Sequence, residues 1–182
     1  TKPWKCSSNC LYCPNDLRMP KSYLADEPAC QRAERTFFDP YLQVAARLKA
    51  LTEMGHVTDK VELIVLGGTW SDYPESYQIW FIRELFRALN DGSRAHEILP
   101  ARKRTYESTG ISCDPESLTR FVSEEQHRID NRETTYNQAF DRLYGENDAW
   151  ASVAQRQKAT WEELEAEHLA NVDGHHRVVG LV

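Results

Sequence analysis

Apolar residues recur at helical spacing in the first half of the chain. One such segment starts at Asp39-Pro40, where the aspartate can cap a helix and the proline needs no amide hydrogen. Its apolar positions follow every three or four residues: Tyr41, Val44, Leu48 and Leu51. Gly55 is placed to end it. The pattern predicts a helix that begins at residue 40 and ends before residue 55.

A second amphipathic segment starts at Pro74-Glu75 and ends at Asp91-Gly92, with an apolar face made by Ile82, Leu85, Phe86 and Leu89. Between the two predicted helices lies Val61–Leu66, an apolar run that is typical of a parallel strand covered on both faces. A similar run occurs at Val178–Leu181. The order helix, strand, helix, strand predicts an α/β fold with a parallel sheet.

Charge divides the chain of 182 residues into two parts. Residues 1–90 carry 11 basic and 11 acidic side chains, whereas residues 91–176 carry 10 basic and 17 acidic ones. The acidic part contains a helix start at Asp114-Pro115 and the acidic stretch Trp161–Leu169. We therefore expect an acidic, helical insertion over residues 91–176, with most of its charges on a solvated surface. A docking surface for another domain is the alternative.

No apolar run approaches the roughly 18 residues that cross a bilayer, the longest strongly apolar stretch being Leu63–Leu66. The first six residues do not resemble a secretory signal, and the chain does not begin with Met. We expect a cytoplasmic chain without membrane contact, cut from a longer protein. The acidic average is unusual for a nucleic-acid binder, so RNA would have to contact the mildly basic first 38 residues or the cluster Arg102–Arg104. Both are otherwise ordinary surface.

Three of the five cysteines, Cys6, Cys10 and Cys13, lie within eight residues. A disulfide framework fits this odd number and close spacing poorly. Structural zinc needs four ligands, and the nearest histidine, His56, lies 43 residues beyond Cys13. The bacterial ferredoxin spacing is also absent. Three thiolates on one loop suit a cubane iron–sulfur cluster that leaves one iron open to a substrate or cofactor.

The spacing C-x3-C-x2-C, with Tyr12 just before the last cysteine, resembles the signature of the radical S-adenosylmethionine enzymes. The resemblance implies that Cys6, Cys10 and Cys13 bind a 4Fe–4S cluster. It also implies that S-adenosylmethionine chelates the open iron and is cleaved by reduction to a 5′-deoxyadenosyl radical. Tyr12 would lie near the adenine of that cofactor; the alternative is a residue that packs within the chain.

Gly67-Gly68-Thr69 follows the predicted strand Val61–Leu66, at the end of a parallel strand where ligands bind. Glycines allow a ligand to approach the backbone closely, although a plain turn would use the same residues. The position resembles the glycine motif of the radical enzymes, whose backbone holds the amino group of the cofactor. The resemblance therefore implies that Gly67 and Gly68 help to seat S-adenosylmethionine, with Thr69 nearby.

The segment after the cysteines resembles the catalytic subunit of Elongator and its single-chain bacterial relatives over roughly residues 6–90. The resemblance is carried by Cys13-Pro14, Lys21-Ser22-Tyr23, Glu27-Pro28, Arg32-Ala33, Asp39-Pro40-Tyr41, Gly55-His56, Asp59-Lys60-Val61-Glu62, Gly67-Gly68-Thr69 and the helix Glu75–Leu89 with Tyr77 and Trp80-Phe81-Ile82. It implies a partial (β/α) radical S-adenosylmethionine barrel. Residues 1–90 would be its first part, 91–176 the helical acidic insertion, and 177–182 the start of the next barrel strand.

In that family the lysine of an Asp-Lys-Val/Ile-Glu stretch contacts acetyl-coenzyme A, and the match here falls on Lys60. A cation suits a pyrophosphate or a ribose phosphate. The alternative for Lys60 is a solvated lysine at the entry of a strand.

The resemblance implies an enzyme that carboxymethylates the wobble uridine of transfer RNA, with S-adenosylmethionine as cofactor and acetyl-coenzyme A as co-substrate. The remaining barrel strands and an acetyltransferase-like domain would lie beyond Val182, so we expect this chain alone to be unable to complete the reaction. Two alternatives remain open. One is a radical enzyme that acts on a small molecule, and the other is a non-catalytic, metal-binding scaffold domain.

Overall fold

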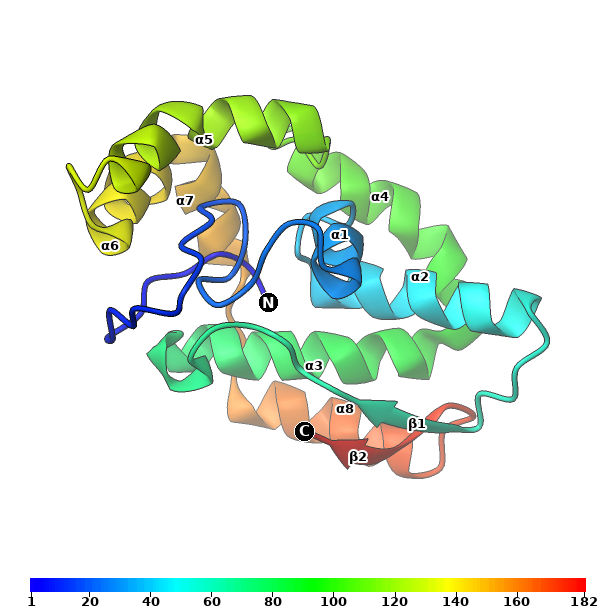
Figure 1. The fold of residues 1–182 in the computed structure, drawn as a ribbon. Helices are drawn as coiled ribbons and strands as arrows, with labels where there is room; N and C mark the ends of the chain where they lie inside the picture. Colours follow the sequence, from blue (N-terminus) through cyan, green and yellow to red (C-terminus); the bar gives the residue numbers. More distant parts are fainter. The chain divides into compact units, whose positions relative to one another are not determined.

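The computed structural model describes residues 1–182, which pack into two compact units that interleave along the chain (Figure 1). Unit 1 comprises residues 1–38, 66–74 and 106–156. Unit 2 comprises residues 39–65, 75–105 and 157–182. The barrel boundaries expected at residues 90 and 176 remain a prediction.

Unit 2 contains a small parallel sheet and the helices around it. Its strands are β1 (Lys60–Leu63) and β2 (Arg177–Leu181), which run side by side with Lys60 opposite Arg177 (Figure 1). Its helical segments are α2 (Pro40–Glu53), α3 (Glu75–Asp91), η2 (Gly92–Arg94), most of α4 (Ala95–Glu107) and α8 (Trp161–Val172). The predicted α/β character is therefore confirmed. That these two strands belong to a larger barrel remains a prediction.

The prediction that residues 61–66 form a strand covered on both faces is wrong in part. β1 ends at Leu63, which is the one buried residue of the strand, while Ile64 is 63% exposed. In β2, Val179 is 64% exposed. The sheet has only two strands, so each strand has one unpaired edge and is not enclosed as in the interior of a larger parallel sheet.

The predicted helix starts and stop are confirmed. The carboxylate of Asp39 accepts a hydrogen bond from the backbone N–H of Leu42 at 3.0 Å, and α2 begins with Pro40. Asp114 caps α5 (Pro115–Asp130) in the same way, through the N–H of Ser117 at 2.8 Å. Gly55 has φ +82°, a left-handed conformation that suits a residue just after a helix.

A buried ion cluster ties three helical segments of unit 2 together. Arg102 on α4 donates from Nε to both carboxylate oxygens of Asp39 at 2.9 and 2.8 Å, and its Nη1 lies 2.5 Å from Oε2 of Glu84 on α3. Arg83 donates to the other oxygen of Glu84 at 2.7 Å. Asp39 and Glu84 are fully buried, so these pairs satisfy charges that would otherwise be costly.

Unit 1 combines the first 38 residues with helices from the second half of the chain. Its helical segments are α1 (Pro28–Glu34), η1 (Trp70–Asp72), α5, α6 (Tyr136–Phe140), η3 (Asp141–Gly145) and α7 (Asp148–Arg156). Leu17 is fully buried against Val122, Tyr136 and Phe140. The core residues of α5, α6 and η3 lie within the insertion expected over residues 91–176. The central helices of that insertion therefore share a core with the cysteine-containing segment.

Two tyrosines strengthen this core with hydrogen bonds to the first segment. Tyr136 donates its hydroxyl to the backbone oxygen of Met19 at 3.3 Å, and Tyr144 donates to that of Leu17 at 2.7 Å. Both hydroxyl groups are buried, and burial raises their pKa values far above the ordinary range. They therefore remain protonated donors in the folded chain.

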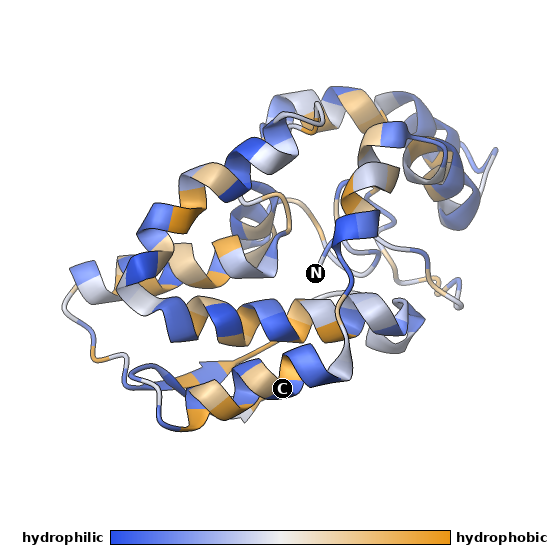
Figure 2. Ribbon diagram, turned by 180° about the vertical axis from the view of Figure 1, so that it is seen from behind, coloured by the Kyte–Doolittle hydropathy of each residue, from blue (hydrophilic) through white to orange (hydrophobic).

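Hydropathy alternates between polar and apolar residues along most helices, as expected of helices with one buried face (Figure 2). None of the helices combines the length and the apolar character that a bilayer span requires.

Candidate functional site

The three clustered cysteines lie on one loop of unit 1 but differ in exposure. Cys6 is 8% exposed and buried, Cys13 is partly exposed, and Cys10 is exposed. All five cysteines of the chain carry free thiols. The side chains of the three are not gathered into a metal-binding group in this conformation. The loop thus carries one buried, one partly exposed and one exposed thiol, without a preformed cage.

The structure brings two predicted site residues together. The Sγ of Cys6 lies 3.4 Å from the hydroxyl oxygen of Thr69, and the backbone N–H of Ser8 donates to the same sulfur at 3.4 Å. The cysteine loop and the turn that follows β1 therefore meet at Cys6. These segments are more than sixty residues apart in the sequence, and only the fold makes them neighbours.

The glycine pair lies in that turn and is partly buried. A Cβ atom added at Gly67 would lie 1.9 Å from Oγ1 of Thr1, which no side chain tolerates without movement. At Gly68 the nearest atom is the backbone nitrogen of Lys21 at 3.8 Å, an ordinary contact distance. Gly67 is thus needed for close packing within the chain. A contact of either glycine with a cofactor remains a prediction.

Asp72 is a site residue that the sequence pattern did not reveal. Its carboxylate accepts the backbone N–H of Ser7 at 2.8 Å and lies 3.2 Å from the Ser7 hydroxyl. The hydrogen bond from the Ser7 backbone holds the pKa of Asp72 below its ordinary value. In addition, the indole of Trp4 donates to the backbone oxygen of Asp72 at 2.8 Å. Residues 69–72 therefore fix the cysteine loop at two adjacent points.

The tip of the loop projects into solvent. Leu11 is 93% exposed and Tyr12 is 96% exposed, so the interpretation of Tyr12 as a residue packed within the chain is wrong. The N–H of Cys13 donates to the backbone oxygen of Cys10 at 3.2 Å, which closes a tight turn around these two residues. Tyr12 is available to a bound molecule, and its contact with an adenine remains a prediction.

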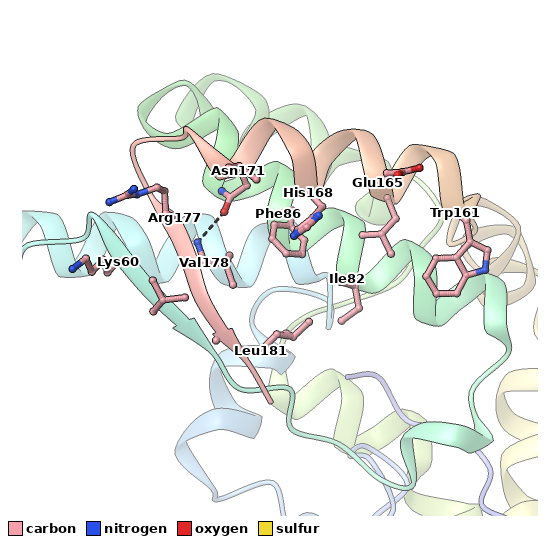
Figure 3. Close-up of a pocket in the computed structure, with 14 residues that line it drawn as sticks. Lys60, Ile82, Phe86, Trp161, Glu165, His168, Asn171, Arg177, Val178 and Leu181 are labelled. Atoms are coloured by element: carbon pink, nitrogen blue, oxygen red, sulfur yellow. Dashed lines mark hydrogen bonds between the residues drawn. The ribbon is translucent and has the colours of Figure 1, made fainter.

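Lys60 belongs to unit 2, where it starts β1 and lines a groove of about 910 Å³ (Figure 3). Its partner in the register is Arg177, and the two cations lie at the same end of the strands. Apolar side chains of α3 and α8, among them Ile82, Phe86 and Leu164, line the rest of the groove. Lys60 is exposed and available for an anionic group, and its contact with acetyl-coenzyme A remains a prediction.

No family model matches the chain. Curated relatives do. The tRNA uridine(34) acetyltransferase of Dehalococcoides mccartyi is 46% identical over 90 residues, which is 50% of this chain and 20% of that protein. The enzyme of the same name from Methanocaldococcus jannaschii is 40% identical over 109 residues, 57% of this chain and 20% of that protein. Human Elongator complex protein 3 is 40% identical over 113 residues, 56% of this chain and 20% of that protein.

The matched part of this chain is homologous to these proteins. The predicted resemblance to the Elongator catalytic subunit and its single-chain relatives is thereby confirmed. The chain spans about a fifth of the length of these relatives, and the match covers about half of the chain.

Proposed function

We propose that this chain is part of an enzyme that modifies uridine 34, the wobble uridine, of transfer RNA by radical S-adenosylmethionine chemistry. The names of the relatives support the substrate and the use of acetyl-coenzyme A. The observation that carries the chemistry is the meeting of Cys6 and Thr69 at 3.4 Å, because within unit 1 it joins the cysteine loop to the turn Gly67-Gly68-Thr69. Glycines in such a turn allow a ligand to approach the backbone closely.

The donor set of the loop fits an iron–sulfur cluster. Cysteine thiolates are the usual ligands of such clusters, and Cys6, Cys10 and Cys13 are the thiols that would hold it. When bound, the cluster would supply one electron to cleave S-adenosylmethionine. The role of the chain is to hold one thiol fixed at Cys6 and to present Cys10 and Cys13 on an exposed turn.

The residues around the loop would bind the other groups. Tyr12, exposed at the loop tip, would cover the adenine, while the backbone of Gly67 and Gly68 and the side chain of Thr69 would contact the methionine part of the cofactor. Lys60, exposed in unit 2, would bind a phosphate of acetyl-coenzyme A through its ammonium group. The acetyl group would provide both carbons of the added carboxymethyl group. One methyl hydrogen would pass to the 5′-deoxyadenosyl group, and the methyl carbon would bond to C5 of the base, whose hydrogen would leave as a proton with return of the electron supplied. Hydrolysis of the thioester would release coenzyme A and leave the carboxylate.

Two parts of the proposal extend past these residues. The parallel strands β1 and β2 would be neighbouring strands of a (β/α) barrel, and further barrel strands and an acetyltransferase-like domain would complete the enzyme. We therefore expect cluster formation by this chain, and carboxymethylation of transfer RNA only by a chain that contains those further parts.

Reconstitution of the chain with iron and sulfide under nitrogen tests the proposal. We expect a 4Fe–4S absorbance band and, after reduction, a paramagnetic signal that shifts when S-adenosylmethionine is added. Cys10→Ala should abolish both signals. Cys113→Ala, which removes a cysteine outside the loop, should leave them unchanged. Stoichiometric zinc without any cluster, or a cluster that survives Cys10→Ala unchanged, would overturn the proposal.

The substrate class is tested separately, with the complete enzyme. Transfer RNA should accelerate the cleavage of S-adenosylmethionine if uridine 34 is the target. Cleavage that proceeds at the same rate with and without transfer RNA would favour a radical enzyme that acts on a small molecule.

A further inference from the structure

Asn137 on α6 contacts the first cysteine of the loop with both ends of its side-chain amide. The backbone N–H of Cys6 donates to Oδ1 of Asn137 at 3.1 Å, and Nδ2 of Asn137 donates to the backbone oxygen of Cys6 at 2.8 Å. One side chain therefore satisfies both backbone polar groups of one cysteine. This pairing fixes the peptide planes on either side of Cys6 and hence the direction of its Cα–Cβ bond.

The position of Asn137 is itself well determined. It lies in the first turn of α6, whose start is closed by a reciprocal pair of hydrogen bonds between Thr135 and Gln138. The flanking side chains of Tyr136 and Phe140 are buried in the core of unit 1. The backbone of Asn137 is therefore fixed, and its side-chain amide reaches Cys6 from a defined position.

The remaining long-range contacts of the loop are concentrated near the same end. The carboxylate of Asp72 accepts the N–H of Ser7, and Nζ of Lys21 donates to the backbone oxygen of Ser8 at 2.5 Å. Beyond Ser8 the chain turns outward to the exposed residues Cys10 and Tyr12. The loop is thus held near its first cysteine, and the side-chain amide of Asn137 is the group that binds the backbone of Cys6 itself.

We propose that Asn137 is a positioning residue that holds Cys6 in the orientation required of a cluster ligand. It lies 131 residues from Cys6, within the segment expected to be an acidic insertion. The insertion would then help to position a ligand of the metal site, in addition to forming a solvated surface. The role of Cys6 as a cluster ligand rests on the proposed function. The role of Asn137 in orienting Cys6 and shielding its thiol from solvent does not.

Alkylation of the metal-free full chain tests the positioning role directly. The rates at which iodoacetamide modifies Cys6 and Cys30 are measured by peptide mass spectrometry in the native chain. Cys30 lies in a neighbouring core of unit 1, is 5% exposed, and burial raises its thiol pKa to about 11. It therefore reports on any general loosening of the unit.

Asn137→Ala removes both hydrogen bonds, and we expect Cys6 to be alkylated about tenfold faster while Cys30 keeps its rate. Asn137→Asp keeps the acceptor for the Cys6 N–H but loses the donor. Its rate of Cys6 alkylation should therefore lie between those of the unmodified chain and Asn137→Ala. Asn131→Ala, at the exposed end of α5, should change neither rate. An unchanged rate at Cys6, or an equal rise at Cys6 and Cys30, would overturn the proposal.

The role of Asn137 at the metal site is tested by measuring how fast the reconstituted chain loses iron to a chelator. We expect Asn137→Ala to lose iron to a chelator about tenfold faster than the unmodified chain, while Asn131→Ala loses it at the unmodified rate. Equal loss from Asn137→Ala and the unmodified chain would overturn this part. A chain that takes up no iron at all would overturn the proposed function, and the alkylation rates would still decide the role of Asn137.

Discussion

At the scale of single residues, the two glycines of the turn after β1 make different demands. Gly67 approaches Thr1 so closely that a methyl group would overlap its hydroxyl, whereas Gly68 has room for one. Gly67→Ala should therefore lower the free energy of unfolding by about 1–3 kcal/mol, as overpacking does. Gly68→Ala should change it little, and thermal unfolding compares the two. Equal melting temperatures would contradict the close contact at Thr1.

Glu125 provides a prediction about pH. Arg142 donates to its two carboxylate oxygens at 2.9 and 2.6 Å, and this pairing holds the pKa of Glu125 below its ordinary value of 4.5. A carboxyl group with a lowered pKa stabilises the fold above its unfolded pKa, and the stabilisation disappears as the pH falls through its folded pKa.

Glu125→Gln should therefore melt at a lower temperature than the unmodified chain at pH 7. The difference should begin to shrink as the pH falls below 4.5 and vanish once Glu125 is protonated in the folded chain. The neighbouring exposed Glu124 serves as control, since Glu124→Gln should have little effect at any pH. A difference that stays constant down to strongly acidic pH would show that the charge of Glu125 is not involved.

At the scale of elements, two helices that both start with Asp-Pro differ in the burial and the ion pairing of the capping aspartate. Asp39-Pro40 and Asp114-Pro115 both begin a helix through a side-chain hydrogen bond. Asp39 is fully buried and also pairs with Arg102, whereas Asp114 lies at the surface.

Asp39→Ala should therefore cost about 3–5 kcal/mol, because it leaves Arg102 beside Glu84 in a buried cluster that has lost one of its negative charges. Asp114→Ala should cost less, since it removes an exposed cap alone. Urea unfolding at pH 7 measures both. A similar loss for the two variants would mean that the buried cluster adds nothing beyond the cap.

These elements also show how far the sequence could be read. Both aspartate–proline helix starts and the strand at residue 178 were predictable, because capping and short apolar runs are local signals. The short helices α1, α6 and η3 carry no comparable periodicity. The length of β1 was not predictable, since it is set by pairing with β2, which lies more than a hundred residues away in the sequence.

The candidate site was predictable to a similar extent. The cysteine spacing identified the three thiols, and the position after a strand identified the glycine turn. Asp72 and Asn137 could not be found in this way. Each is one polar residue without a motif, and each becomes part of the site only because folding brings it to Ser7 or Cys6.

At the scale of the whole molecule, the segments of the two units alternate along the chain, and this decides which segment can be deleted without unfolding a unit. Residues 106–156 contribute every buried residue of the core around Leu17 except Leu17 itself. A chain in which a flexible linker joins Thr105 to Gln157 should keep the helices of unit 2, while residues 1–38 become readily cleaved by protease. Limited proteolysis with peptide mapping compares this chain with the full one. Unchanged protection of residues 1–38 would show that residues 106–156 are dispensable for unit 1.

The exposed turn at the tip of the cysteine loop has a consequence for handling the protein in air. Its hydrogen bond from Cys13 to Cys10 keeps their Cα atoms within about 7 Å, close to the spacing that a disulfide requires. Oxidation should therefore join these two thiols to each other and spare the buried Cys6. A peptide two hydrogens lighter would reveal the bond. Such a chain would look folded and pure, and it would remain unable to take up iron until a reductant reopened the turn.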